Sequence, residues 1–537
     1  MTNTSAWWRG AAIYQIYPRS FADSNGDGVG DLPGITARLD HVASLGVDAI
    51  WLSPFFTSPM ADFGYDVANY REVDPIFGTL ADFDALISRA HALGLRVIID
   101  QVWAHSSDRH PWFINSRASR HNPCGDWYVW ADAKADGSPP NNWQSVFGGP
   151  AWTWDARRGQ YYFHNFLKEQ PQLNVHLSEV RAELLSIARF WLDGGVDGFR
   201  FDAINFAMHD PTLTDNPPAP DDDAPRSRPF DFQLHRYNQG HAGIPAFLER
   251  VRALLDEYSD RFSVAEVGGA DSDREMKLFT AGGARLHSAY GFDFLYAPAL
   301  TPATVRNALA NWPAEDGVGW PSWAFENHDA PRAVSRWTMP EHRDAFARAK
   351  MLLLACLRGN IFLYQGEELG LPQVEIAFED LRDPEAITNW PLTLSRDGAR
   401  TPMPWEARSP GVGFTTGKPW LPIGTEHRAL AVDAQATDPD SMLAWTRRVL
   451  ALRKTHDALR IGDLRFVKAP ADVIAFEREA DGERLLCVIN LGDTPARRRF
   501  DATRWRVILA THEPVGDVLP PFAGFVAQEL GDEAAPR

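Results

Sequence analysis

The chain of 537 residues is long enough for roughly two or three domains, and its 45% hydrophobic and 23% charged residues are ordinary globular values. Its 53 basic and 71 acidic residues give a net charge of −18, which argues against nucleic acid and anionic membranes as partners and favours a neutral or cationic small substrate. The cysteines, Cys124, Cys356 and Cys487, are widely spaced without a C-x-x-C pair, so we expect neither a disulfide framework nor a zinc site, and a reducing compartment is the simplest interpretation.

The N-terminal residues, MTNTSAWWRGAAIYQIYPRS, lack the basic region, apolar stretch and small-residue cleavage site of a secretory signal. The most apolar run, MLLLACL at residues 351–357, is far too short to span a membrane. We therefore expect a soluble, cytoplasmic protein without a membrane partner. The sequence leaves open whether the protein is a monomer or a homodimer.

Short β-rich apolar runs alternate with helical patterns along most of the chain. Eight such runs occur, separated by helix-like segments such as residues 80–93 and 345–357: AAIYQIYP, VDAIWLSP, RVIIDQVW, VDGFRFD, FSVAEV, FDFLY, WAFENHD and NIFLYQGEE. This alternation predicts a parallel sheet with crossover helices, and eight strands are the number that closes a barrel. The predicted fold class is α/β, a (β/α)8 TIM barrel, whose reactive groups gather where the strands meet the following loops.

Two segments depart from the barrel pattern. Residues 104–165, after the third strand, are rich in Trp, Gly, Pro and Asn and too long for an ordinary loop, so they predict an inserted subdomain. After a helix predicted at 442–453, the alternating runs DVIAFERE, RLLCVINL and RWRVILA indicate an antiparallel β domain, with Asp481-Gly482 as a hairpin turn between the first two. We assign residues 1–103 and 166–458 to the barrel, 104–165 to the subdomain, 459–537 to a β-sandwich-like C-terminal domain, and 215–229 to a biased, loop-like stretch within the barrel.

The run GFRFDAIN at residues 198–205 carries two charges in an otherwise apolar strand. Side chains alternate faces along a strand, so Arg200 and Asp202 point the same way, and an ion pair that closes the strand is one interpretation. Other predicted strands also end in polar groups: Asp100 and His105 after the third, Glu266 at the fifth, and His328 with Asp329 at the seventh. These groups are expected to meet at one rim of the barrel.

Asp202 and Glu266 end neighbouring strands, which lie about 4.8 Å apart. Their carboxyl groups are therefore expected about 5 to 5.5 Å apart, the separation of a retaining glycosidase, in which one carboxylate attacks the anomeric carbon and the other serves as acid and then base. Arg200 should keep Asp202 ionised, whereas the like charges of Asp202 and Asp329 should raise the pKa of Glu266. Asp202 is then the nucleophile and Glu266 the acid.

The motifs DQVWAH (residues 100–105), GFRFDAIN, FSVAEV, ENHD (326–329) and QPQLN (170–174) resemble those of the α-glucosidase and oligo-1,6-glucosidase group of glycoside hydrolase family 13, in the family's order. AAIYQIYPRSFADSNGDGVGDLPGI and DGARTPMPWE are similar to stretches typical of that group, so the resemblance covers nearly the whole chain. It implies Asp202 as nucleophile, Glu266 as acid and base, and Asp329 as a third carboxylate that binds sugar hydroxyls. It also implies that His105, Arg200 and His328 bind the same glucose and that Tyr65 stacks beneath it. Phe166 is implied at one wall of the pocket, and Asp62 with Arg400 is implied to close the pocket.

Each of these side chains has a structural alternative. Tyr65 and Phe166 are also compatible with core aromatics, and His105 and His328 with ordinary hydrogen-bonded histidines. Asp100 is expected to support Arg200 rather than to touch substrate. The chain departs from the family pattern at Ala104, where an asparagine usually precedes the histidine. That departure questions a calcium-linked role for the position, but not the catalytic set.

The segment DSNGDGVGD at residues 23–31 spaces its oxygen-bearing side chains like a calcium loop, with Gly28 at the sharp turn. Gly34 stands at the twelfth position in place of the bidentate glutamate, and no flanking helix pair is evident, so the segment is not an EF-hand. In the resembling enzymes this loop commonly holds an ion, which implies a structural Ca²⁺ or Mg²⁺ at Asp23, Asn25, Asp27, Val29 and Asp31. The alternative is an Asx- and Gly-rich turn, and no cofactor is expected for catalysis.

Ala203 follows the predicted nucleophile and bears on the linkage that is cleaved. In the resembling enzymes, valine at this position accompanies α-1,6 cleavage, and alanine or threonine accompanies α-1,4 cleavage. The physical reason is steric, because a branched side chain would crowd a 4-linked acceptor ring. Ala203 therefore favours maltose over isomaltose, and its alternative role is a small residue required by helix packing.

Together these patterns predict a retaining, exo-acting α-glucosidase that removes or transfers a terminal α-1,4-linked glucosyl unit. Its partners are small α-glucosides and acceptor sugars or alcohols. A sucrose-processing or α-1,6-directed enzyme of the same family stays open, although APRAVSRWTMPEHRD lacks the RLDRD-type stretch of the isomerases. An alternative of another class is a non-catalytic barrel that serves as a binding or transporter-partner subunit. Such relatives lose catalytic carboxylates and gain a membrane anchor, whereas this chain has all three acids and no anchor is expected.

Overall fold

The computed structural model describes residues 6–221, 226–312, 319–393, 395–497, 500–513 and 515–530. Its centre is a closed barrel of eight parallel strands, in the order β1-β13-β12-β11-β10-β9-β5-β2. The predicted (β/α)8 barrel is therefore confirmed. Its strands are β1 (Ala12–Ile16), β2 (Ala49–Leu52), β5 (Arg96–Val102), β9 (Gly198–Asp202), β10 (Phe262–Glu266), β11 (Ser288–Tyr290), β12 (Trp320–Ala324) and β13 (Asn360–Tyr364).

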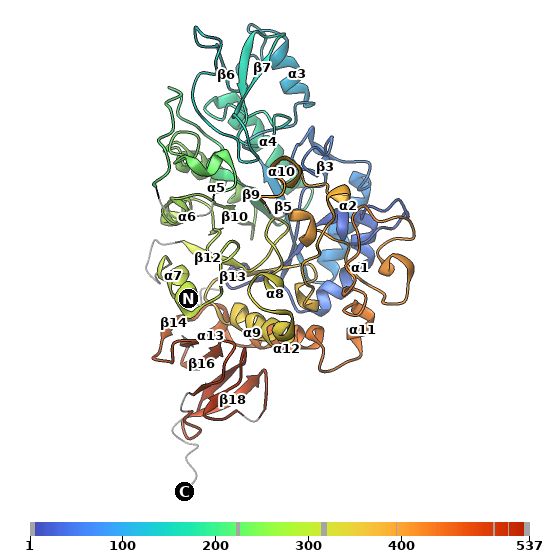
Figure 1. The fold of residues 1–537 in the computed structure, drawn as a ribbon, viewed down its shortest axis with the longest axis vertical. Coiled ribbons are helices and arrows are strands. Elements are labelled where there is room, and N and C mark those ends of the chain that lie inside the picture. The colour runs from blue at the N-terminus through green and yellow to red at the C-terminus, as the bar shows by residue number, and fades with distance from the viewer. Residues whose placement is uncertain are drawn as a thin grey trace.

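Helices surround the barrel and cover the outer face of its strands (Figure 1). Each has a buried apolar face, and α2 begins with a capping box in which Thr79 and Asp82 satisfy each other's backbone N–H groups. The barrel-layer helices are α1 (Leu32–Ser44), α2 (Leu80–Ala92), α4 (Ser178–Asp193), α5 (Ile244–Leu255), α6 (Ser272–Thr280), α7 (Pro302–Ala310), α8 (Ala333–Arg336) and α9 (Arg343–Cys356). Among the described residues, none of the helices has the length and apolar character needed to cross a bilayer.

The sixth predicted strand does not overlap the strand in the structure, and the seventh predicted strand begins three residues too late. The apolar run FDFLY begins at Phe292, but β11 ends at Tyr290 and consists of only three residues. Phe292 and Tyr296 instead lie in the turn after the strand and line the pocket described below. An aromatic run that borders a ligand pocket has the same composition as a buried strand, so composition alone does not separate the two.

The segment predicted as an inserted subdomain folds beside the carboxyl ends of the strands. Residues 104–165 contain α3 (Pro111–Ala118) and a three-stranded antiparallel sheet of β6 (Trp130–Ala131), β7 (Trp152–Asp155) and β8 (Gln160–Phe163). A smaller excursion after β2 forms the antiparallel pair β3 (Phe56–Thr57) and β4 (Asn69–Val73). Both excursions leave the barrel on the side where its reactive groups are expected.

The C-terminal part is antiparallel, as predicted. After α11 (Val432–Ala436), α12 (Met442–Thr455) and α13 (Asp457–Arg460), it forms a five-stranded sheet and a two-stranded sheet that share an apolar core. Asp481-Gly482 makes the predicted hairpin, because Ala480 pairs with Glu483. The strands are β14 (Asp463–Phe466), β15 (Val473–Ala480), β16 (Glu483–Asn490), β17 (Ala496–Arg497), β18 (Trp505–Ala510), β19 (Val518–Leu519) and β20 (Gly524–Glu529).

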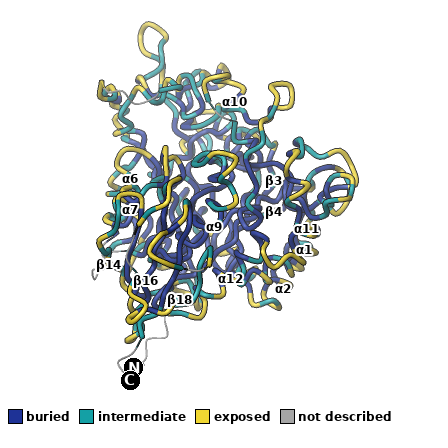
Figure 2. The backbone as a smooth tube through the Cα atoms, turned by 60° about the horizontal axis from the view of Figure 1, so that its bottom comes forward, coloured by how far each residue is buried: buried dark blue, intermediate teal, exposed yellow. Residues whose placement is uncertain are grey.

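The C-terminal sheets and the inserted subdomain lie at opposite ends of the molecule (Figure 1). The buried residues form one continuous centre, whereas exposed residues lie at the periphery, in loops and on the outer faces of helices (Figure 2). The C-terminal domain is held against the barrel partly by the buried Arg478, which donates to the carbonyl oxygen of Cys356 on α9. The inserted subdomain, beside the carboxyl ends of the barrel strands, and the C-terminal domain therefore lie on opposite sides of the barrel (Figure 1).

Candidate active site

A pocket of about 820 Å³ lies at the carboxyl ends of the barrel strands. Its wall contains eight of the eleven residues predicted for catalysis or substrate binding: Asp62, Tyr65, His105, Phe166, Asp202, Ala203, Glu266 and Asp329. The other three, Arg200, His328 and Arg400, are buried and contact carboxylates of that wall. The polar rim expected from the strand ends is therefore present.

Arg200 is the centre of the carboxylate cluster. The parallel pairing of β9 with β10 places Asp202 and Glu266 side by side at adjacent strand ends. The buried guanidinium contacts Asp100 at 3.1 Å, Asp202 at 2.6 Å and Glu266 at 2.5 Å. The contact with Glu266 is an ion pair rather than an aligned hydrogen bond, since Nη2 of Arg200 has no hydrogen-bond partner among the described residues. Asp100 supports Arg200, as predicted.

The pKa values of the two strand-end carboxylates are shifted mainly by burial. Burial raises the pKa of Glu266 to about 7, Arg200 opposes the rise, and the charges of Asp202 and Asp329 add to it. The predicted direction is right, but burial rather than like charge is the larger cause. Burial also raises the pKa of Asp202, and it outweighs the opposing effect of Arg200. Arg200 favours the ionised form of Asp202, but the net shift is upward, so the expectation that Arg200 keeps this carboxylate ionised is not met by the shift of its pKa.

Asp329 is shifted in the other direction. Burial acts to raise the pKa of this carboxylate, but the neighbouring His328, Arg400 and Arg396 together overcome burial and hold the pKa well below its ordinary value. Arg400 contacts the carboxylate at 2.6 Å and Arg396 at 3.3 Å. At a pH at which Glu266 takes up a proton, Asp329 therefore stays ionised. This difference separates the role of a binding carboxylate from that of an acid.

Tyr65 and His328 form a stacked pair at the base of the pocket wall. Their ring centroids are 5.4 Å apart with an interplanar angle of 6°. The amide of Gln15 donates to Nδ1 of His328 at 2.7 Å, so Nε2 carries the proton and faces the Tyr65 hydroxyl at 2.6 Å and Asp329 at 3.2 Å. Tyr65 in turn donates to Asp100 at 3.1 Å. Burial lowers the pKa of His328 to about 3, so this histidine is neutral at pH 7.

His105 and Phe166 form another part of the wall. Nε2 of His105 lies 2.9 Å from the carbonyl oxygen of Tyr65, and burial lowers the pKa of the imidazole to about 4. Its Nδ1 has no hydrogen-bond partner among the described residues. The Phe166 ring lies 5.2 Å from the His105 ring and 5.2 Å from that of Phe206. The wall here is aromatic and uncharged.

Asp62 and Tyr65 reach the pocket from the loop between β3 and β4. The buried carboxylate of Asp66 fixes this loop by accepting hydrogen bonds from the Ser58 hydroxyl at 2.9 Å and from the N–H groups of Ala61 and Asp62, each at 3.0 Å. A long excursion after β2 thus carries two site residues over the barrel. Its sequence signal is the cluster of aspartate and aromatic residues in ADFGYD.

Arg396, which is not among the predicted residues, occupies the place expected for Arg400 beside Asp62. It contacts Asp62 at 3.0 Å, Asp383 at 2.8 Å and Asp329 at 3.3 Å. The structure thus gives Asp62 a different partner from the one expected, and Arg400 contacts Asp329 instead. The available signal was the position of Arg396 at the start of the RDGAR turn, one residue before the stretch used for the resemblance.

Ala203 has a left-handed backbone conformation, with φ 38° and ψ 42°. This turn directs its N–H toward Glu266, and the N–H donates to Oε2 at 3.2 Å. Ala203 also lines the pocket. A left-handed conformation is costly for β-branched residues, so a small side chain here has a backbone reason in addition to the steric one.

Tyr290 is a second site residue that sequence reasoning missed. Its hydroxyl donates to Oε1 of Glu266 at 2.9 Å and accepts from Nε of Arg200 at 3.1 Å. It was missed because it ends β11, the strand that was predicted too late in the chain. Gln170 lies in a quoted motif without an assigned role, and it lines the pocket with its amide 3.2 Å from Asp62.

In the loop of residues 23–31, the oxygen-bearing side chains accept hydrogen bonds mainly from backbone N–H groups of the same loop. The Asp23 carboxylate accepts from three backbone N–H groups and from the Thr415 hydroxyl. Asp31 caps helix α1 by accepting from the N–H of Gly34 at 2.7 Å, and it also binds Ser24. Within the described part of the chain, no group of three His, Cys, Asp or Glu residues is placed to hold a metal ion. These hydrogen bonds are those of an Asx- and Gly-rich turn, and the ion that the resemblance implies at Asp23, Asn25, Asp27, Val29 and Asp31 stays a prediction.

Two carboxylates at adjacent strand ends that share one arginine, beside a third that stays ionised, define a glycoside hydrolase of the barrel type. The family model described as "Alpha amylase, catalytic domain" matches residues 15–462, and "Domain of unknown function (DUF3459)" matches residues 460–526. The chain belongs to the α-amylase family, glycoside hydrolase family 13, and to its α-glucosidase and oligo-1,6-glucosidase subgroup.

Relatives in this subgroup match almost the whole chain. A "Probable alpha-glucosidase" of Rhizobium meliloti is 52% identical over 93% of this chain and 92% of the relative, and an oligo-1,6-glucosidase of Parageobacillus thermoglucosidasius is 38% identical over 92% of each. Among solved structures, the alpha-glucosyl transfer enzyme XgtA has a TM-score of 0.94 at 51% identity, covering 98% of this chain and 100% of XgtA. The trehalulose synthase MutB from Pseudomonas mesoacidophila MX-45 has a TM-score of 0.89 at 33% identity, with coverage of 98% and 100%. The protein is therefore a family 13 glucosidase or glucosyltransferase.

Proposed function

We propose that this protein is a retaining, exo-acting α-glucosidase that cleaves terminal α-1,4-linked glucose from maltose-type substrates and transfers part of it to sugar or alcohol acceptors. The observation that carries the proposal is the shared guanidinium of Arg200, which contacts Asp202 at 2.6 Å and Glu266 at 2.5 Å at adjacent strand ends. One carboxylate is thereby kept beside the other, while their surroundings differ.

In the first half of the proposed reaction, Asp202 attacks the anomeric carbon as the glycosidic bond breaks. Glu266 donates its proton to the leaving oxygen, so the leaving sugar departs neutral and the glucosyl unit is bound covalently to Asp202. A pKa of about 7 keeps Glu266 protonated over the acidic to neutral range, which suits a general acid. The amide of Ala203 holds Oε2 of Glu266 toward the nucleophile.

In the second half, the ionised Glu266 removes a proton from water or from an acceptor hydroxyl. The oxygen then attacks the anomeric carbon and displaces Asp202, so the configuration is retained after two inversions. Asp329 and the Asp62–Arg396 pair line the same pocket and supply the charged groups for sugar hydroxyls. Phe166, Phe206 and Phe292 present apolar faces to an incoming acceptor.

Transfer is supported by a specific comparison. XgtA, with 51% identity and a TM-score of 0.94, is described as an alpha-glucosyl transfer enzyme. An aromatic wall excludes water without offering it hydrogen bonds, which favours a bound acceptor over hydrolysis. The proposal therefore includes transfer as a second outcome of the same intermediate.

The test is product analysis with maltose, isomaltose, sucrose and trehalose, together with the anomeric configuration of the first glucose released. We expect maltose to be the best of the four and α-glucose to appear first. Equal turnover of isomaltose and maltose would contradict the linkage, and β-glucose as the first product would contradict retention.

Three further expectations stay predictions. A structural Ca²⁺ or Mg²⁺ at residues 23–31 rests on the family resemblance alone and has no part in the proposed chemistry. A cytoplasmic location is supported by three unpaired cysteines, of which Cys356 and Cys487 are buried. Light scattering measures whether the protein is a monomer or a homodimer.

A further inference from the structure

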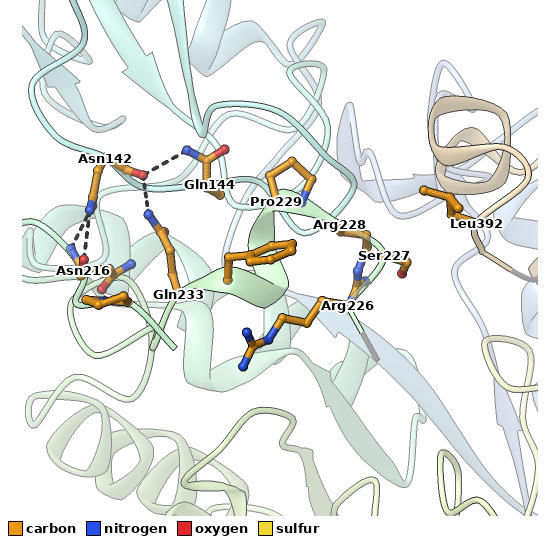
Figure 3. A pocket seen from close by; sticks show the side chains of 11 residues that line it. Asn142, Gln144, Asn216, Arg226, Ser227, Arg228, Pro229, Gln233 and Leu392 are labelled. Atoms are coloured by element: carbon orange, nitrogen blue, oxygen red, sulfur yellow. Dashed lines mark hydrogen bonds between the residues drawn. The ribbon is translucent and has the colours of Figure 1, made fainter. Parts of the chain in front are cut away.

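A hollow of about 740 Å³ adjoins the catalytic pocket, and Ser227, Arg228 and Leu392 line both (Figure 3). This hollow therefore belongs to the site already described. A separate feature is a cluster of buried charges that lines neither hollow but is connected to the loop that carries Asp329. We call it the buried charge cluster, and it consists of Glu326, Arg332, Lys350 and Glu367.

The buried charge cluster balances two cations against two carboxylates. None of its four residues is more than 2% exposed. Nζ of Lys350, on α9, lies 2.5 Å from Glu367 and 3.4 Å from Glu326, and the Arg332 guanidinium lies 4.0 Å from Glu326. The other oxygen of Glu326 accepts from the N–H of Ala333 at 2.7 Å, at the start of α8. An unpaired charge would be costly in these surroundings, so the cluster holds its members in place.

Arg332 joins the loop of Asp329 to the turn of Arg400. It follows Asp329 by three residues in the chain. Its Nη1 donates to the carbonyl oxygen of Gln365 at 2.8 Å, and its Nη2 donates to that of Ala399 at 3.1 Å. Ala399 ends the 3-10 helix η8 and directly precedes Arg400. One guanidinium therefore connects the two segments whose side chains meet at Asp329.

The carbonyl oxygen of Ala399 has a second donor on the barrel itself. Tyr364 ends β13, and its hydroxyl donates to this oxygen at 3.1 Å. The Arg332 guanidinium lies 4.4 Å from the centre of the Tyr364 ring, so the two donors also contact each other. The residue before Arg400 is thus held by one loop side chain and by one strand side chain.

The turn that is held in this way carries Arg400 to Asp329. Nη2 of Arg400 lies 2.6 Å from the Asp329 carboxylate, and its Nε donates to the carbonyl oxygen of His328 at 2.7 Å. The charge of Asp329 raises the pKa of Glu266, and Arg400 compensates part of that charge. The other groups that face Glu266 are Arg200, Asp202, Tyr290 and the N–H of Ala203.

We propose that Arg332 is a positioning residue that keeps Arg400 against Asp329 and thereby controls how strongly Asp329 acts on Glu266. The inference rests on the proposed roles of Asp329 and Glu266 in the reaction. Arg332 itself does not line the pocket. Its planar guanidinium donates to two carbonyl oxygens at once, a geometry that the single ammonium group of a lysine does not reproduce.

The experiment measures kcat/KM for maltose as a function of pH in the wild type, Arg332→Lys, Tyr364→Phe and Arg453→Lys. Arg332→Lys keeps the positive charge of the cluster and removes the forked donor, so its effect reports position rather than charge. Tyr364→Phe removes only the second donor to Ala399.

Arg453→Lys is the matched control. Arg453 lies on α12, is only 2% exposed and also donates to backbone carbonyl oxygens, those of Gly10 at 3.2 Å and Ala355 at 2.6 Å. Gly10 precedes β1, so this arginine supports the amino ends of the barrel strands, away from the carboxylates of the site. The control variant should lower Tm and keep the pH profile of the wild type.

We expect kcat/KM at the optimum pH to fall about tenfold in Arg332→Lys, as is typical when a hydrogen bond from a charged donor is lost. The alkaline limb should move to higher pH by about half a unit, because an Asp329 charge that is less compensated by Arg400 disfavours the ionised form of Glu266. Tyr364→Phe should move the limb in the same direction by less. This direction is opposite to the one expected when the charge of Asp329 is removed.

An alkaline limb that is unmoved in Arg332→Lys, or that moves to lower pH, would overturn the inference, and so would an equal shift in Arg453→Lys. If Arg332→Lys does not fold, Tyr364→Phe decides, and an unmoved limb in that variant overturns the inference. A wild type without turnover of maltose, or without an alkaline limb, would contradict the proposed function instead, so the two failures are distinguishable.

Discussion

Three carboxylates meet in the catalytic pocket and three aspartates lie in the loop of residues 23–31, but the two clusters find their partners in different ways. In the pocket, Asp202 and Glu266 end two strands, Asp329 lies in the loop after β12, and all three are paired with arginine side chains. In the loop, Asp23, Asp27 and Asp31 accept hydrogen bonds mainly from N–H groups of the same short segment.

This difference decides what each cluster does. Backbone N–H groups satisfy the loop carboxylates largely within the loop and the start of the helix that follows it. The pocket carboxylates are buried with few backbone donors, and their pKa values are therefore spread by burial and by individual cations. General acid and base catalysis requires carboxylates with different pKa values, whereas a turn requires only that its polar groups are hydrogen-bonded within the loop.

The largest expected effect separates the two clusters by the same chemical change. Asp202→Asn should fold normally and lose at least about 10³-fold in kcat, because the amide does not form the glucosyl intermediate. Asp27→Asn, which keeps an oxygen for the N–H of Val29, should retain activity within about twofold, a surface change of about 0.5 kcal/mol or less. Steady-state kinetics on maltose measures both, and wild-type turnover in Asp202→Asn would end the assignment of the nucleophile.

The next effect concerns the steric limit at the pocket. Ala203→Val should shift the ratio of kcat/KM from maltose toward isomaltose, roughly 10- to 200-fold, chiefly by loss on maltose. Because Ala203 has φ 38°, valine also strains the backbone and should lower Tm, so Ala203→Gly serves as the control that relieves the backbone without adding bulk.

Ala203→Gly should keep the preference for maltose. A well-folded valine variant with the ratio of the wild type would return Ala203 to a purely structural role. A wild type that prefers isomaltose would contradict the steric argument as a whole.

A smaller effect is expected in the pH dependence of kcat/KM, whose alkaline limb reports the loss of the Glu266 proton near pH 7. The negative charge of Asp329 raises the pKa of Glu266, so Asp329→Asn should move the alkaline limb to lower pH. The hydroxyl of Tyr290 stabilises the ionised form, so Tyr290→Phe should move the limb to higher pH. Shifts in the same direction would show that one of these couplings is assigned wrongly.

The smallest effect is expected at the loop. If hydrogen bonds alone hold the loop, Tm should be the same in excess EDTA and in excess Ca²⁺ or Mg²⁺, with activity unchanged. A rise of several degrees with either cation, lost in Asp27→Ala, would instead establish the structural ion that the family resemblance implies. Thermal unfolding monitored by circular dichroism distinguishes the two outcomes.

The sequence by itself determined the parts of the protein that depend on local periodicity. Seven of the eight barrel strands, the helix α12 and the Asp481-Gly482 hairpin follow from residue spacing, because strand and helix periods and turn residues act over a few positions. The carboxylates Asp202 and Glu266 were found for the same reason, since they end strands whose order along the chain is their order in the barrel.

Apart from the Arg200–Asp202 pair within one strand, only the tertiary structure decided which side chain pairs with which acid. Arg396 contacts Asp62 across more than three hundred residues, and Tyr290 contacts Glu266 from a strand of three residues. Such pairs are set by how loops of different strands converge and by burial, which lowers the local dielectric and makes an unpaired charge costly. Neither convergence nor burial has a period in the sequence, so these partners become visible only once the barrel is closed.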